Sequence, residues 1–155
     1  MKITYPEYWP QFYTATIYQW QHLLAEDKHK DIIVDSLKFL VTEKRIELNA
    51  FVIMSNHIHL IWQPMFGFTP SNIQASFMKY TAQQLKRSLS KNNIEALGSF
   101  KREPLGIELI SPAVFEQKID YIHYNPVIAD LCINPEDYHY SSARFYYDGQ
   151  IASEC

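Results

Sequence analysis

The stretch "IELNAFVIMSNHIHLIWQP", from Ile46 to Pro64, contains two apolar segments joined by a predicted turn at Ser55-Asn56. Both segments are rich in β-branched and aromatic residues, which is typical of β-strands. Side chains alternate between the two faces of a strand, so His57, His59 and Ile61 share one face, and Ile58, Leu60 and Trp62 share the other. The sequence therefore predicts a β-hairpin in which one face belongs to a core and the other presents two imidazoles.

Helical and strand periodicities continue on both sides of this hairpin. Alternation predicts a strand over 12–18, and a short apolar run predicts another over 105–110. Helical spacing predicts helices near 29–45 and 70–92, with the apolar stripes Ile33, Leu37, Leu40, Val41 and Ile73, Phe77, Tyr80, Leu85. A last helix begins after the N-cap Ser111 and should stop at Pro126. The order β-α-β-β-α-β plus a helix predicts an α+β, ferredoxin-like split βαβ fold with a central antiparallel sheet.

The length and composition indicate one globular domain over residues 1–155. The chain is 47% hydrophobic, enough to bury a substantial core. Its two cysteines are too few for a disulfide framework, which favours a cytoplasmic protein. The uncharged stretch from Asn49 to Met78 contains histidines, prolines and amides, so it does not predict a membrane span.

Basic residues are concentrated in one sector of the chain although the net charge is -3. Between positions 79 and 102 there are six basic residues and one acidic residue, a local charge of +5. Such a sector can bind phosphates, which makes Lys79, Lys86, Arg87, Lys91, Lys101 and Arg102 candidate DNA-binding residues. The alternative is an ordinary solvated helix face.

The last predicted helix, "FEQKIDYIHYNPV", carries two polar residues of interest. Phe115, Ile119 and Ile122 form the stripe that should pack on the sheet. Tyr121 and Asn125 are four residues apart and lie one turn from each other on a neighbouring face. An amide oxygen can bind a metal and a phenol can act as a nucleophile. A helix C-cap at Asn125, and two histidines that bind nothing, are the plain alternatives.

Taken together, these motifs resemble a known family. The stretch "FVIMSNHIHLIWQP" is similar to the histidine–hydrophobic–histidine (HUH) strand of single-tyrosine transposases from bacterial insertion sequences. The stretches "DYIHYNPVIADLC" and "DYHYSSARFY" resemble the REP-associated tyrosine transposase branch of that group. The resemblance spans roughly residues 12–147. It implies that Tyr121 is the nucleophile, that His57 and His59 bind a metal, and that Asn125 is the third ligand.

The resemblance also implies a chemistry and a substrate. A divalent ion, Mg²⁺ or Mn²⁺, would bind the scissile phosphate, and Tyr121 would cleave single-stranded DNA near hairpins through a 5′-phosphotyrosine. The active sites could lie within one chain or be shared in a homodimer. Two other interpretations stay open: a hairpin-binding regulatory module that does not cut, and a small-molecule metalloenzyme that uses the histidine pair.

Overall fold

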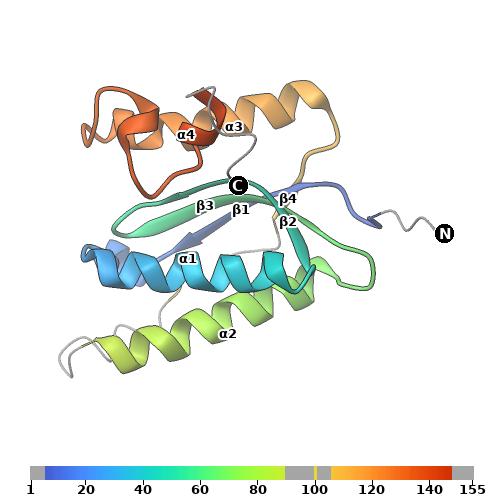
Figure 1. The fold of residues 1–155 in the computed structure, drawn as a ribbon, viewed down its shortest axis with the longest axis horizontal. Coiled ribbons are helices and arrows are strands. Elements are labelled where there is room, and N and C mark those ends of the chain that lie inside the picture. The colour runs from blue at the N-terminus through green and yellow to red at the C-terminus, as the bar shows by residue number, and fades with distance from the viewer. Residues whose placement is uncertain (1–5, 90–99, 101–105, 148–155) are drawn as a thin grey trace.

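A four-stranded antiparallel sheet forms the centre of the protein (Figure 1). The computed structural model describes residues 6–89, 100 and 106–147. The strands are β1 (Gln11–Thr16), β2 (Ile46–Ile53), β3 (His57–Pro64) and β4 (Ile107–Glu108), in the order β2-β3-β1-β4. The β2–β3 hairpin turns through Ser55 and Asn56, where the amide of Met54 donates to the carbonyl of His57 at 2.9 Å. The predicted antiparallel α+β fold is confirmed.

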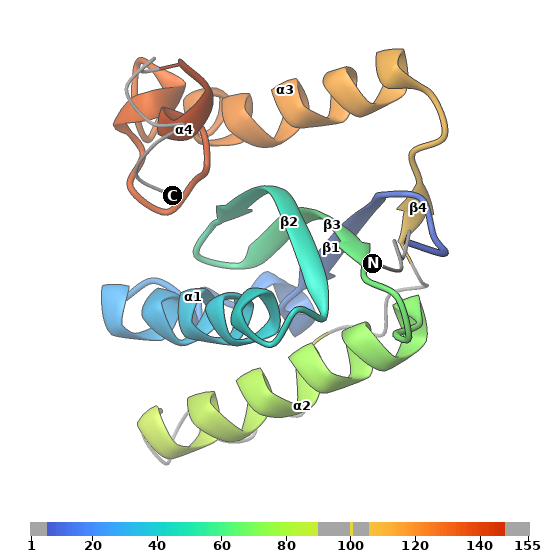
Figure 2. The same cartoon turned by 45° about the vertical axis from the view of Figure 1, so that its right-hand side comes forward.

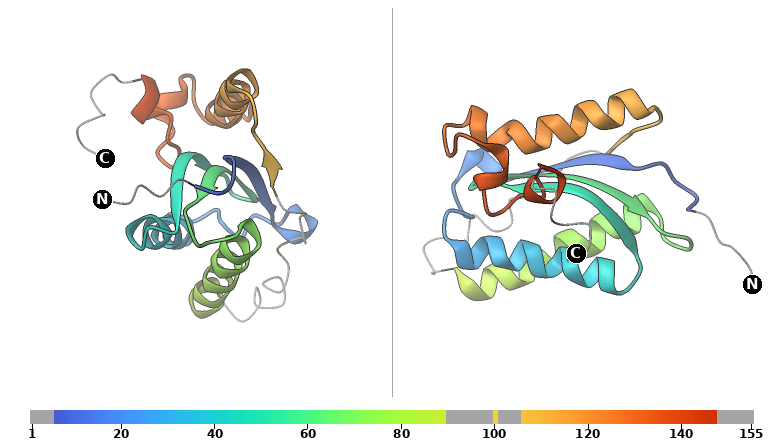
Figure 3. Two further views of the ribbon diagram at one scale, coloured as in Figure 1. Left: turned by 90° about the vertical axis from the view of Figure 1, so that its right-hand side faces the viewer. Right: turned by 45° about the horizontal axis from the view of Figure 1, so that its top comes forward.

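Helices cover both faces of this sheet. Helices α1 (Asp27–Thr42) and α2 (Pro70–Ser88) lie against one face, whereas α3 (Pro112–Ile128) and the short α4 (Arg144–Tyr147) lie over the other, as the turned views show (Figures 2 and 3). Among the described residues, no helix combines the length and apolarity that crossing a membrane requires. The sheet thus separates two distinct helical layers.

Each layer has its own core, as the alternation of side chains in β1 and β3 requires. On the α1–α2 side, Tyr13, Ile58, Leu60 and Trp62 pack with helix residues. On the α3 side, Phe12, Ala50, Val52, Ile61, Ile119 and Ile122 form a smaller cluster. The predicted stripes were wrong at Val41 and Tyr80, which are exposed. Thr81, four residues after Phe77, takes the buried place, while the Tyr80 ring stacks on Phe39 at 6.5 Å between centroids.

Identifiable residues begin and end helix α3. Ser111 caps the first turn by accepting a hydrogen bond from the amide of Val114 at 3.2 Å, and Pro112 follows it. The prediction that Pro126 stops this helix was wrong, because α3 continues to Ile128. Proline removes one amide donor, but its own carbonyl still accepts from Leu131 at 2.9 Å. The helix ends near Asp130, whose φ of 61° is left-handed.

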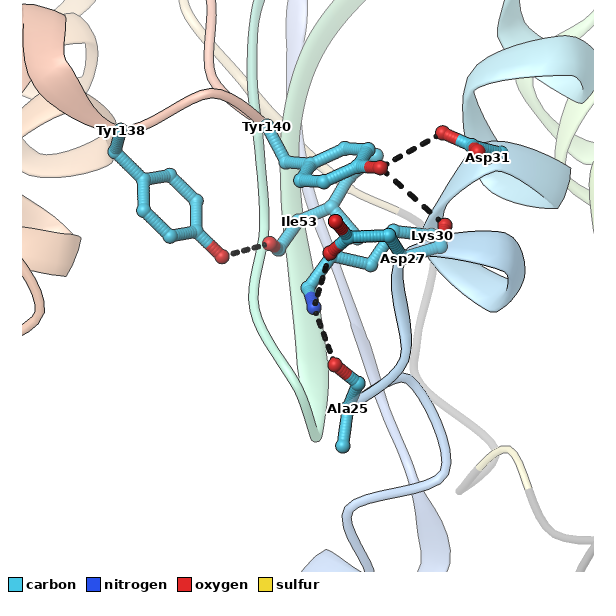
Figure 4. Close-up of polar contacts among 7 residues, drawn as sticks. All are labelled: Ala25, Asp27, Lys30, Asp31, Ile53, Tyr138 and Tyr140. Atoms are coloured by element: carbon cyan, nitrogen blue, oxygen red, sulfur yellow. Dashed lines mark hydrogen bonds and ion pairs between the residues drawn. The ribbon is translucent and has the colours of Figure 1, made fainter.

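The segment after α3 links the α3 side of the sheet to β2 and α1 (Figure 4). The Tyr138 hydroxyl donates to the carbonyl of Ile53 at 2.6 Å, at the end of β2. The Tyr140 hydroxyl donates to Asp31 Oδ1 at 2.8 Å on α1. The amide of Ile53 also donates to the carbonyl of Tyr140 at 2.8 Å. These bonds cover part of the β2 edge and hold the chain that follows α3 in place.

Candidate active site

The two histidines lie side by side on the sheet face that α3 covers. They belong to β3, which is paired on both sides, and their partners on β1 are Thr16 for His57 and Thr14 for His59. The ring centroids are 4.8 Å apart. The prediction that both side chains point to one side is confirmed, and the period-2 alternation of a strand is the cause.

Hydrogen bonding orients the His57 ring towards α3. Asn56 Oδ1 lies 2.7 Å from His57 Nδ1, and a hydrogen bond to this amide oxygen requires the tautomer that carries the proton on Nδ1. In the neutral ring, Nε2 then holds a lone pair. That atom lies 3.2 Å from Asn125 Oδ1, which is also an acceptor. In that tautomer the two atoms are both acceptors, and a cation bound to both would stabilise the pair; in the other neutral tautomer Nε2 would donate to Asn125 Oδ1.

Burial favours the neutral form of both imidazoles. It lowers the pKa of His57, an effect that the Asn125 side chain opposes. It lowers the pKa of His59 to about 3, with further contributions from the charges of His57 and Lys118. His59 Nδ1 is hydrogen-bonded to Thr14 Oγ1 at 2.9 Å. Metal ligation requires a neutral imidazole whose other nitrogen is held by a hydrogen-bond partner, and Nδ1 of each ring has such a partner.

Tyr121 lies next to the histidine pair, one helical turn before Asn125. Its ring centroid is 5.2 Å from that of His59 and 5.9 Å from that of Phe12, and 47% of the residue is exposed. Lys118 Nζ lies 5.5 Å from the centroid of the Tyr121 ring. α3 therefore brings an accessible phenol and a cation to the same surface as the two imidazoles, all within one chain.

Tyr124 and His123 occupy other faces of α3. Tyr124 is 45% exposed, and no ring contact joins it to either histidine within the part of the chain that the structure describes. His123 is fully buried, and its Nε2 lies 2.8 Å from Ser142 Oγ. It points towards the segment after α3, so it is not placed to take a proton from Tyr121.

The predicted basic residues are not part of this cluster. Lys79, Lys86 and Arg87 lie on α2, in the helical layer on the opposite face of the sheet from α3 (Figure 2). Lys91, Lys101 and Arg102 lie outside the described residues. The DNA-binding role of all six stays a prediction.

Sequence reasoning missed the residues that orient the histidines. Asn56 was identified only as a turn residue and Thr14 only as a strand residue, yet each is hydrogen-bonded to one imidazole. The sequence shows that Phe12, Thr14 and Thr16 share one face of β1. To predict that Thr14 contacts His59, however, the pairing register between β1 and β3 had to be known.

The residues present fit a divalent ion in part. Two imidazoles and one amide oxygen form a set of neutral nitrogen and oxygen ligands. The 3.2 Å between His57 Nε2 and Asn125 Oδ1 is close to the roughly 3 Å between neighbouring ligands of an octahedral ion. In the described ranges there is no group of three or more His, Cys, Asp or Glu side chains that could hold a metal. A metal here would therefore depend on Asn125 and on bound substrate oxygens.

Solved structures of other proteins share the fold. No protein-family model and no curated protein matches the sequence. A REP-associated tyrosine transposase bound to a REP hairpin aligns over 92% of this chain and 80% of its own, with a TM-score of 0.70 and 17% identity. A candidate transposase from Deinococcus radiodurans R1 aligns over 84% and 98%, with a TM-score of 0.51 and 19% identity. The chain therefore shares its fold with a REP-associated tyrosine transposase.

Proposed function

We propose that this protein is a metal-dependent single-tyrosine transposase that cleaves and rejoins single-stranded DNA next to hairpins. The observation that carries the proposal is the convergence of His57, His59, Asn125 and Tyr121 from β3 and α3 on one partly exposed surface. The shared fold supports it, because one of the similar structures is a transposase bound to a hairpin. Fold alone does not define a reaction, so the side chains carry the argument.

His57, His59 and Asn125 are the residues that would hold the ion. Asn56 and Thr14 orient the two imidazoles, because each contacts Nδ1 of one ring and leaves Nε2 for ligation. Mg²⁺ or Mn²⁺, when bound, would polarise the phosphoryl oxygens and balance the charge that develops on them. Lys118, beside Tyr121 and Phe12, adds a positive charge on the same side.

Tyr121 supplies the nucleophile in this proposal. Its phenol oxygen forms a bond to the scissile phosphorus as the bond from phosphorus to the 3′ oxygen breaks. The phenol loses its proton, and the released 3′ oxygen takes one up. The 5′-phosphotyrosine retains a phosphodiester-like bond, so a second 3′-hydroxyl can reverse the step and join strands without ATP. In this structure the phenol and the histidines come from the same chain, so the cluster needs no second copy; a homodimer stays a prediction.

The test is a covalent trap on labelled hairpin DNA with single-stranded extensions of mixed sequence, incubated with Mn²⁺ and then denatured. The unmodified protein should form a protein–DNA band that protease removes. Tyr121→Phe should abolish the band and keep DNA binding, because only one oxygen is lost. Tyr124→Phe is the matched control, since it lies on the same helix with nearly the same exposure.

Three outcomes decide between the interpretations. A band that survives in Tyr121→Phe and disappears in Tyr124→Phe shows that the nucleophile is misassigned. Hairpin binding without a band from the unmodified protein, with any divalent metal, favours a regulatory module that does not cut. The absence of both hairpin binding and a band contradicts a role on DNA.

A further inference from the structure

An exposed tryptophan lies at the end of the histidine cluster. After β1, the chain forms a single 3-10 turn, η1 (Tyr18–Trp20), before it reaches α1. Trp20 is 58% exposed, and Gln19 and Trp20 have left-handed φ angles of 53° and 54°. Non-glycine residues rarely adopt this backbone conformation, and two such residues in succession are strained. The indole is thus held out towards solvent by an unfavourable backbone.

This turn is fastened to the hairpin that carries the histidines. The amide of Ile17 donates to the carbonyl of Asn56 at 3.0 Å, and the amide of Leu24 donates to the carbonyl of Ser55 at 2.9 Å. His22 Nδ1 and Ser55 Oγ are hydrogen-bonded at 2.5 Å. These bonds place the Trp20 ring 6.1 Å from the His57 ring, with 75° between the ring planes. Trp20 therefore belongs to the rim of the site.

Trp20 and Tyr121 lie towards opposite ends of the cluster. Along β1, Phe12 pairs with Ile61, Thr14 with His59, and Thr16 with His57, and Trp20 follows beyond that end. α3 runs along the same row. Lys118 lies over Phe12, Tyr121 beside His59, and Asn125 at His57. The His57–Asn125 pair therefore lies between the attacking phenol and the indole.

We infer that Trp20 is a stacking platform for the unpaired base on the leaving-group side of the scissile phosphate. The inference rests on the proposed function. In an in-line displacement the attacking and leaving oxygens are on opposite sides of the phosphorus. With Tyr121 at one end of the row, the nucleotide that keeps the 3′ oxygen extends towards Trp20. An exposed indole stacks on any base, because every base has a π-face.

The test measures DNA binding in EDTA, so that neither a metal nor cleavage contributes. The probe is a hairpin with single-stranded extensions of mixed sequence, compared with the same hairpin without extensions and with one whose extensions are abasic. Trp20→Ala should bind the extended hairpin about 5- to 150-fold more weakly, the effect of losing one stacked base. Trp20→Phe, which keeps a ring, should lose less, and neither variant should change binding of the hairpin without extensions.

Trp9 provides the matched control. It is 56% exposed, but it precedes β1 at the end remote from His57. Trp9→Ala should bind all three probes as the unmodified protein does. On abasic extensions, the unmodified protein should bind no better than Trp20→Ala, and binding of the full probe should quench the fluorescence of Trp20.

Two results overturn the inference, and they differ. If the unmodified protein prefers the extended hairpin and Trp20→Ala binds it as Trp9→Ala does, the platform is absent while the proposed function stands. If the unmodified protein binds none of the hairpins, the proposed function fails and the platform fails with it.

Discussion

Replacing Asn125 with alanine distinguishes a metal ligand from a residue that makes a structural hydrogen bond to His57. If His57 Nε2 and Asn125 Oδ1 are both acceptors, the 3.2 Å contact contributes no hydrogen bond in the metal-free protein. Alanine is also the better helix former, by about 0.6 kcal/mol. The free energy of unfolding of metal-free Asn125→Ala should therefore equal or slightly exceed that of the unmodified protein. Loss of a true hydrogen bond would lower it by about 1 kcal/mol.

The stabilisation that Mn²⁺ gives should be smaller in Asn125→Ala than in the unmodified protein. At a Mn²⁺ concentration of about 100 times the dissociation constant, an ion that binds only the folded state stabilises it by about 2.7 kcal/mol. A variant whose affinity is about tenfold lower should gain only about 1.4 kcal/mol at the same concentration, and one about a hundredfold lower about 0.4 kcal/mol. We expect Asn125→Ala to fall in this range, because one of three protein ligands is removed.

The assay is urea unfolding followed by circular dichroism, with Mn²⁺ and with EDTA. Asn125→Asp is the informative companion, since a carboxylate keeps an oxygen ligand and adds charge, so its gain with Mn²⁺ should match or exceed that of the unmodified protein. The reasoning is refuted if Asn125→Ala is less stable by about 1 kcal/mol in EDTA and gains as much from Mn²⁺ as the unmodified protein does. That pattern would identify a structural hydrogen bond.

Three other measurements test separate parts of the structure. Replacing Lys86, Arg87 and Lys91 together with alanine should weaken single-stranded DNA binding and reduce its salt slope by up to about 2, and an unchanged slope would mean a solvated face. Phe77→Ala, in the α1–α2 core, should lower the free energy of unfolding by about 3–5 kcal/mol, whereas the exposed Phe66→Ala should change it by less than about 0.5 kcal/mol. Burial lowers the pKa of His123 from 6.5 to about 4, so the unfolded chain takes up this proton first, and stability should fall on the order of 1–2 kcal/mol between pH 7.5 and pH 5. His57 and His59, whose pKa values are also lowered, add to the loss over the same range. His123→Gln should therefore reduce the pH dependence by the His123 share, and an equal slope in the variant would assign it to other groups.

Much of the fold could be predicted because each strand and helix has a short, regular spacing of apolar residues. The alternation in β3 and the helical spacing in α1, α2 and α3 depend only on neighbours in the chain, and the predicted elements agree with the structure within a few residues. The end of α3 could not be predicted from Pro126, because a proline near a helix end removes one donor while the bonds that follow it can still form. Tyr80 was misplaced for a related reason, since the choice between positions three and four residues after Phe77 depends on how α2 packs on α1.

The candidate site, like the fold, could be predicted from the sequence only in part. By itself, the sequence determined that His57 and His59 share a strand face and that Tyr121 and Asn125 share a helix face, because these are relations over two and four residues. Only the tertiary structure decided that the two faces meet, since His57 and Asn125 are 68 positions apart and their contact requires α3 to cross the sheet above β3. Other tertiary contacts placed Trp20 at the rim, through the bonds that fasten its turn to the hairpin, and α2 with its lysines on the opposite face of the sheet. Local periodicity arises from the geometry of one element, whereas contacts between distant segments arise from the packing of several.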